Sequence, residues 1–231
     1  MTEAAENKPK QPDGQSLVEA WAQLDAAISQ AQRIVLSTHE NPDGDGLGSQ
    51  LAMYEHLQSL GKECRILNCT NAPAVLHFLD PEGWLETYDP LKHDDWLAKC
   101  DLAIMFDVGD FRRLRCVGQA VARHGISMAS IDHHPQTGYD SSGGSNPFKY
   151  LVVDYSAPST GTLVWQYFND YRTRPLTLQM ANALYAALVT DTGSFKYDNT
   201  DARAHHMAVD LLEAGVRPYD IHKLIYEQRT R

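Results

Sequence analysis

The sequence has no long apolar run and few cysteines, and both absences limit what the protein can be. Its apolar runs are short and interrupted, whereas a membrane-spanning helix needs about 20 predominantly apolar residues. The polar N-terminal segment, 1–15, contains no apolar stretch of the kind found in secretory signal peptides. Cys64, Cys69, Cys100 and Cys116 form no Cys-x-x-Cys pair, so we expect them to pack in a reduced, cytoplasmic protein rather than to bind metal.

Positive charge is also scarce. Lysine and arginine total 20 against 30 acidic residues, which gives a formal net charge of −10. Such a surface repels the phosphates of long nucleic acid, so no partner of that kind is expected. A small phosphate substrate stays compatible with the charge, because bound cations would reverse its sign locally. The composition, 43% hydrophobic and 22% charged, is that of an ordinary globular protein.

The hydrophobic pattern predicts an α/β fold. Short apolar runs alternate with helical patterns, which is typical of a parallel, doubly wound, Rossmann-like sheet flanked by helices on both faces. A helix-rich part follows the last predicted strand. Strands are predicted at 33–38, 63–67, 101–106, 126–131 and 150–154. Helices are predicted at 16–31, 44–60, 116–124, 159–171, 177–190, 201–214 and 218–228.

The remaining segments are predicted to be irregular. Residues 1–15 lack any periodicity and are expected to form a disordered tail before one domain over 16–231. Short helices and turns are expected at 70–98, and a loop rich in glycine and serine at 137–146.

Four clusters of acidic residues and histidines lie at the ends of predicted elements. Three follow predicted strands, and the fourth ends an apolar helix. They contain His39, Asp43 and Asp45; Asp107; Asp132, His133 and His134; and Asp191. Each cluster alone has an ordinary explanation as a turn, a cap or a surface pair. Because the carboxyl ends of parallel strands share the edge where ligands bind, we predict that the clusters meet there.

The charge of these clusters points to metal ions. Four carboxylates within a few ångströms would repel one another and could not all ionise. Two divalent cations would cancel that charge. Oxygen ligands with two imidazoles suit Mn²⁺ better than Mg²⁺ or Ca²⁺, although Mg²⁺ is kept as an alternative, and the lack of cysteine ligands argues against structural Zn²⁺. Two such ions would clamp a phosphoryl group and generate a bridging hydroxide.

Taken in order, these motifs resemble those of the DHH phosphoesterase family, which is named for a triplet such as Asp132-His133-His134. The resemblance covers nearly the whole chain from about residue 16. The sequences of residues 41–45 and 191–195 are most similar to the corresponding motifs of the bacterial nanoRNase/pAp-phosphatase branch. The resemblance implies a hydrolase that removes nucleotides from very short RNA and dephosphorylates 3′-phosphoadenosine 5′-phosphate.

The resemblance also implies roles for individual residues. One metal ion would be held by His39, Asp43 and Asp107. The other would be held by Asp45, Asp107, His133 and Asp191, so that Asp107 bridges the two ions.

The other site residues would act on the substrate or on the ligands. His134 would contact the scissile phosphate, and Asp132 would orient the histidines. Arg113 is a candidate phosphate ligand, with a solvated arginine as the alternative. Ser159 and Thr160 are expected to cap a helix, with a substrate contact as the alternative.

One departure from the family pattern limits what is expected of the substrate. Full-length relatives carry a DHH-associated domain with a glycine-rich segment that binds substrate, and Gly143-Gly144 does not match it. We therefore expect the catalytic domain alone, as a piece of a longer protein or as a naturally short member. The alternatives kept open are a cyclic-dinucleotide phosphodiesterase, an inorganic pyrophosphatase or polyphosphatase, and a metal-binding domain inactive without its partner domain. A homodimer is also left open.

Overall fold

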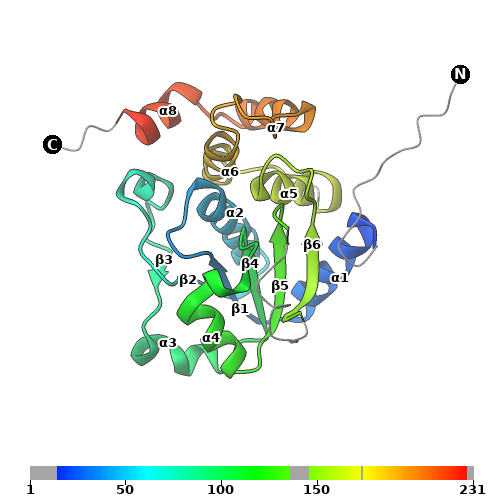
Figure 1. The fold of residues 1–231 in the computed structure, drawn as a ribbon, viewed down its shortest axis with the longest axis vertical. Helices are drawn as coiled ribbons and strands as arrows, with labels where there is room; N and C mark the ends of the chain where they lie inside the picture. Colours follow the sequence, from blue (N-terminus) through cyan, green and yellow to red (C-terminus); the bar gives the residue numbers. More distant parts are fainter. Residues whose placement is uncertain (1–14, 136–145, 173, 228–231) are drawn as a thin grey trace, which may run out of the picture.

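A six-stranded parallel sheet forms the centre of the computed structural model, which describes residues 15–135, 146–172 and 174–227 (Figure 1). The strand order is β3-β2-β1-β4-β5-β6. All strand pairs among these residues are parallel, so the carboxyl ends of all the strands lie at one edge of the sheet. The strands are β1 (Arg33–Thr38), β2 (Glu63–Asn68), β3 (Leu85–Thr87), β4 (Leu102–Phe106), β5 (Ser127–Asp132) and β6 (Phe148–Val153).

Helices connect the strands and continue beyond them. The α-helices are α1 (Leu17–Gln30), α2 (Gly44–Ser59), α3 (Pro90–Leu97), α4 (Arg115–Arg123), α5 (Thr160–Gln166), α6 (Leu178–Asp191), α7 (Ala202–Glu213) and α8 (Pro218–Tyr226). Shorter helical turns are η1 (Ala74–Leu79), η2 (Phe111–Leu114) and the π-helical η4 (Tyr167–Tyr171). Local signals set several of their ends. Ser16 and Glu19 form a capping box at the start of α1, and Gly61, with φ of 73°, follows α2.

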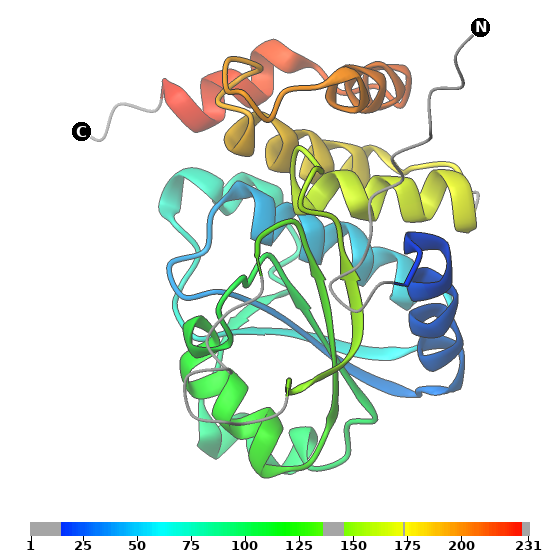
Figure 2. The same cartoon turned by 45° about the vertical axis from the view of Figure 1, so that its right-hand side comes forward.

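Each face of the sheet packs against its own helices. In β1, Val35 contributes to the core under α3 and α4, whereas Ile34 and Leu36 contribute to the core under α1, α2 and α5. A strand covered on both faces needs an unbroken apolar run, which is what 34–36 supplies. Helix α6 packs along α2, and α7 and α8 lie beyond α6 on the side away from the sheet (Figures 1 and 2).

The predicted fold class is therefore confirmed, with changes at the element ends. Strand β5 includes Asp132 as its last residue, and β6 begins at Phe148 rather than at residue 150. Strand β3 was not predicted, because three residues carry too little pattern to distinguish a strand from a turn. The predicted helix 159–171 changes from α-helix to π-helix after Gln166.

Two predicted irregular segments cannot be compared with the structure. The tail 1–15 and the loop 137–146 lie outside the described residues except for Gln15 and Asn146. Within the described part of the chain, the helices fall short of the length and apolar character that crossing a membrane requires.

Candidate metal centre

The four clusters meet at the carboxyl edge of the sheet, as the sequence predicted. His39 follows β1, Asp107 follows β4, and Asp132 is the last residue of β5. Asp45 lies in the first turn of α2, and Asp191 is the last residue of α6. The ligand roles of these residues stay a prediction, but their side chains are in the right place to act together.

The first group contains His39, Asp43 and Asp107, whose nearest ligand atoms all lie within 4.8 Å of one another. His39 Nε2 is 3.7 Å from Asp43 Oδ2 and 3.4 Å from Asp107 Oδ2. The imidazole and the Asp107 side chain are almost fully buried, whereas the Asp43 side chain is about half exposed. The group therefore opens to solvent on the Asp43 side.

The second group contains Asp45, His133 and Asp191, also with ligand atoms within 4.8 Å. His133 Nε2 is 3.7 Å from Asp45 Oδ2 and 3.5 Å from Asp191 Oδ2. This nitrogen is buried and has no hydrogen-bond partner. His133 Nδ1 lies 3.1 Å from the carbonyl oxygen of Ala157. Because a carbonyl only accepts, Nδ1 carries a proton there, and Nε2 is the nitrogen that faces the carboxylates. A cation between them would give Nε2 the partner that it lacks.

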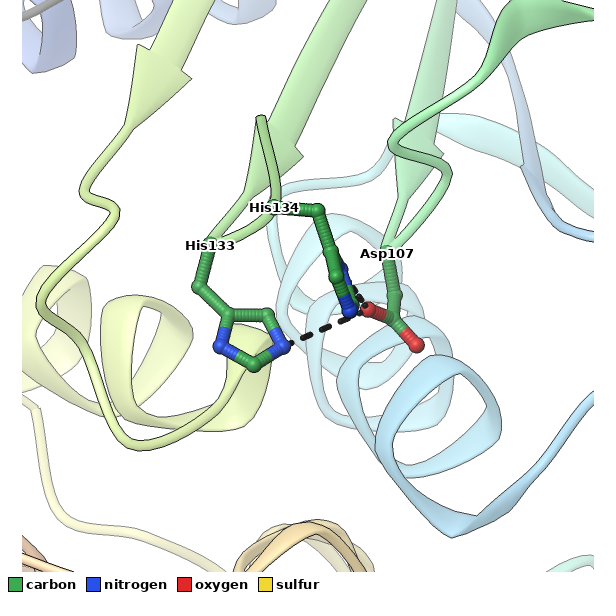
Figure 3. Close-up of side chains that lie close together, drawn as sticks. All are labelled: Asp107, His133 and His134. Carbon is green, nitrogen blue, oxygen red and sulfur yellow. Dashed lines mark ion pairs between the residues drawn. The ribbon is translucent and has the colours of Figure 1, made fainter. Parts of the chain in front are cut away.

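Asp107 joins the two groups. Its Oδ2 faces His39, and its Oδ1 lies 3.7 Å from His133 Nε2 and 3.1 Å from His134 Nδ1. Figure 3 shows both imidazoles directed at this carboxylate. Asp107 has a φ of 57°, a left-handed conformation that is uncommon for residues other than glycine. This turn lets the chain leave β4 sharply while the carboxylate stays between the two groups.

Asp132 belongs to neither of these ligand groups, and its contacts are those of a positioning residue. Its carboxylate is buried and accepts hydrogen bonds from the backbone N–H groups of Val108 (2.9 Å), Gly109 (2.5 Å) and His134 (2.9 Å). The same carboxylate lies 3.1 Å from His134 Nδ1. Asp132 therefore holds the turn after β4 and the imidazole of His134 in one arrangement.

Asp45 is held by a contact that the sequence analysis did not predict. The backbone N–H groups of Thr160 and Gly161 donate to its two carboxylate oxygens at 2.7 and 2.8 Å. Ser159 caps α5 as predicted, since its side chain accepts from Thr162 N. Thr160 does not cap this helix. It is the first helical residue, and its backbone N–H donates to Asp45. A carboxylate at a helix N-terminus is the favourable polarity for the helix dipole.

Close helix packing brings Asp45 and Asp191 together. A Cβ atom at Gly44 would lie 2.5 Å from Thr190 Oγ1, and one at Gly48 would collide with the carbonyl oxygen of Ala183. The glycines of α2 thus allow the backbone of α6 to approach closely. Larger residues there would push the end of α6, and Asp191 with it, away from the site.

The electrostatics of the site are unfavourable without bound cations. Burial, followed by the charges of Asp107, Asp191 and Asp43, raises the pKa of Asp45 well above its usual value. Burial also raises the pKa of Asp191 to about 6, although His133 opposes the rise. Burial disfavours a charged His39, but the carboxylates of Asp107 and Asp43 outweigh it and raise its pKa to about 9. Asp45 and Asp191 therefore bind protons more tightly than usual, and a bound cation would displace those protons.

Arg113 lies beside the first group rather than in open solvent. Its Nη2 is 2.8 Å from His39 Nδ1, and its carbonyl oxygen accepts from Glu40 N. The side chain is only partly buried, so its place beside His39 does not contradict the alternative of a solvated arginine. Its contact with phosphate stays a prediction.

Comparisons with known proteins identify the family of the chain. Residues 33–188 match the model of the DHH family, N-terminal domain. The chain is 33% identical over 186 residues to the bifunctional oligoribonuclease and PAP phosphatase NrnA of Thermus thermophilus, covering 80% of this chain and 51% of that protein. It is 26% identical to the NrnA protein of Bacillus subtilis, covering 90% of this chain and 61% of the relative.

A solved structure shares the fold. An exopolyphosphatase-related protein from Bacteroides fragilis superposes with a TM-score of 0.82 at 22% sequence identity, over 93% of this chain and 62% of that one. The chain thus spans between half and two thirds of the length of these relatives. On the family match and the identity to its relatives, the chain belongs to the DHH family of phosphoesterases, in the NrnA-like branch, and corresponds to the N-terminal domain of that family.

Proposed function

We propose that this chain is a metal-dependent phosphoesterase that hydrolyses very short RNA or 3′-phosphoadenosine 5′-phosphate. The observation that carries the proposal is the pair of ligand groups joined by Asp107. Two neighbouring cation sites suit in-line displacement at phosphorus, since they can stabilise both the attacking and the leaving oxygen. The substrate class is proposed from relatives whose names specify oligoribonuclease and PAP phosphatase activity.

The donor atoms fit two divalent cations. The groups supply carboxylates and imidazoles and no thiolate, which suits Mn²⁺, with Mg²⁺ as the alternative. One ion would be held by His39, Asp43 and Asp107. The other would be held by Asp45, Asp107, His133 and Asp191. When bound, such ions polarise phosphoryl oxygens and supply a water of lowered pKa.

The chain's own residues would bind and orient the phosphate. The His134 side chain is 44% exposed, so a phosphate oxygen can reach it, while Asp132 fixes its orientation. The guanidinium of Arg113 lies beside His39 and can donate to a second oxygen. Donors fixed before the substrate arrives stabilise the developing charge without reorganising.

The test compares activity before and after a carboxylate is removed. Protein freed of metal with a chelator and reloaded with Mn²⁺ should cleave an RNA dinucleotide or 3′-phosphoadenosine 5′-phosphate. Asp107→Asn should lower kcat at least about 1000-fold, because both cation sites lose a ligand and several kcal/mol of transition-state stabilisation. Asp110→Asn is the matched control: Asp110 belongs to neither group, caps η2 and pairs with Arg112, and asparagine caps equally well.

The outcomes separate the proposal from its rivals. Wild-type turnover by the Asp107 variant would contradict the proposed site. Hydrolysis of pyrophosphate alone would favour a pyrophosphatase, and hydrolysis of a cyclic dinucleotide in preference to a linear one would favour the cyclic-dinucleotide phosphodiesterase. Binding of Mn²⁺ without turnover of any phosphoester would favour a metal-binding domain that needs its partner domain for catalysis.

A further inference from the structure

A polar cavity of about 500 Å³ lies at the same edge of the sheet as the metal centre, above β2 and β3. Its volume is within the range of small-molecule sites. The polar lining consists mainly of Asn68, Thr70, Asn71, His77, Glu86 and Thr87. Neither the predicted roles of the motif residues nor the proposed phosphate contacts use this cavity.

The cavity adjoins the first motif directly. Asn68, at the end of β2, accepts a hydrogen bond through Oδ1 from Thr38 N, one residue before His39. Thr70 Oγ1 accepts from Asn41 N at 2.8 Å, in the middle of the motif 39–43. In Figures 1 and 2 the cyan segment after β2 lies beside the blue segment that leads from β1 into α2. One side of the motif therefore faces the metal centre and the other faces the cavity.

The lining favours an uncharged ligand that makes hydrogen bonds. Among the described lining residues there is no arginine or lysine, so the cavity does not suit a second phosphate. Its acids already have partners: Glu86 lies 3.3 Å from Arg65 Nε and 3.2 Å from His93 Nε2, and Asp80 accepts from the backbone of Trp84 and Leu85.

The neutral side chains suit the hydroxyl groups of a sugar and the edge of a base. Hydroxyl and amide groups both donate and accept hydrogen bonds, as a ribose 2′-hydroxyl does. Asn71 and Thr87 meet at the mouth of the cavity, where both are exposed. Ala72, Ala74 and Leu85 add apolar surface on which the flat face of a base can rest.

We infer that this cavity binds the ribonucleoside attached to the phosphate that the metal centre holds. This inference rests on the proposed function, because it assigns the neighbouring part of the same substrate. A nucleotide whose phosphate lies at His134 and Asp107 would extend past the motif 39–43 toward β2 and β3. Recognition there would distinguish a nucleotide ester from a simple phosphate ester.

Two substitutions test the inference with adenosine, an uncharged probe that needs no metal ion. Saturation-transfer NMR should detect weak adenosine binding by the wild type. Ala74→Trp fills the cavity with a large side chain at an exposed position and should abolish the signal. Asn71→Ala should weaken binding roughly fivefold, because it removes one hydrogen-bonding group. The matched control is Ala26→Trp. Ala26 is exposed on α1, which packs against β6, and β6 is the outermost strand on the side of the sheet away from β3.

Kinetics supply a second readout. The measured quantity is the ratio of kcat/KM for an RNA dinucleotide to kcat/KM for bis(4-nitrophenyl) phosphate, which has no nucleoside. The ratio should fall at least roughly tenfold in Ala74→Trp and stay unchanged in Ala26→Trp. Equal adenosine binding by wild type and Ala74→Trp, or none by the wild type, overturns the inference. If adenosine binds as expected but no phosphoester is hydrolysed, the proposed function fails and the nucleoside site stands.

Discussion

Replacing Asp191 by asparagine should stabilise the metal-free protein at neutral pH. The pKa of this carboxyl rises from 3.8 to about 6, mainly through burial and despite the opposing charge of His133. A rise of roughly two units corresponds to about 3 kcal/mol. Because the folded protein holds this proton more tightly than the unfolded chain, stability falls as the pH rises from about 4 to 6, and the loss persists at pH 7.5. Asparagine has no charge to bury, and its oxygen can still accept the hydrogen bond from Asn199 Nδ2.

Urea unfolding in the presence of a chelator measures this effect. At pH 7.5 the free energy of unfolding of the variant should exceed that of the wild type by up to about 3 kcal/mol. The difference should shrink toward zero at pH 4, where the wild-type carboxyl is protonated. Asp198→Asn is the matched control, because Asp198 is exposed a few residues further along the chain. That change should stay within about 0.5 kcal/mol.

With Mn²⁺ in excess, the wild type should become more stable than Asp191→Asn. A cation stabilises the folded state by an amount that grows with the logarithm of its affinity, and the variant has lost a proposed ligand. An Asp191→Asn protein that is less stable than the wild type at pH 7.5 without metal, or a difference that does not depend on pH, would refute the reasoning. The burial of this charge would then not be a cost that cations relieve.

Three further predictions concern the support of the site. Asp132→Ala should lower the free energy of unfolding by roughly 3 kcal/mol, because three backbone N–H groups lose their acceptor; chemical denaturation measures this, and a loss below about 1 kcal/mol would contradict it. Gly161→Ala should lower the free energy of unfolding by about 1–3 kcal/mol and weaken Mn²⁺ binding, because the added Cβ would lie 2.6 Å from Ala187 Cβ and 3.3 Å from Asp45 Oδ1. Thermal unfolding and metal titration measure the two effects. The apparent affinity for Mn²⁺ should rise between pH 6 and 9, since an ion at His39 must displace a proton held with a pKa of about 9; calorimetry in two buffers of different ionisation enthalpy should show proton release, and none would argue against His39 as a ligand.

Sequence reasoning located the site because its residues end elements whose pattern is strong. The apolar runs before His39 and Asp107 are fully buried strands, and parallel strands bring their carboxyl ends together whatever lies between them in the sequence. That rule predicted the convergence of the three clusters that follow strands, but it does not place Asp191, which ends a helix.

The contacts that hold the ligands could not be predicted in the same way. Asp45 accepts hydrogen bonds from the backbone N–H groups of Thr160 and Gly161. Almost every residue type has such a group, so the sequence does not show which one acts as a donor. The close approach of α2 and α6 was marked only by glycines, which equally suggest a turn. Strand β3 and the cavity beside it depend on a segment too short and irregular to have a period.

The position of the proposed ligands along the chain has a consequence for how the protein is made. The first group is complete once Asp107 has left the ribosome, whereas the second waits for Asp191 at the far end of α6. Until α6 packs against Gly44 and Gly48 of α2, this side of α2 is uncovered and Asp191 is not yet beside Asp45. Contacts between residues so distant in sequence require the closure of a long loop, which costs conformational entropy. A nascent chain can therefore bring the first group together early, but the proposed two-ion centre, and any activity that depends on it, must wait until α6 has docked on α2.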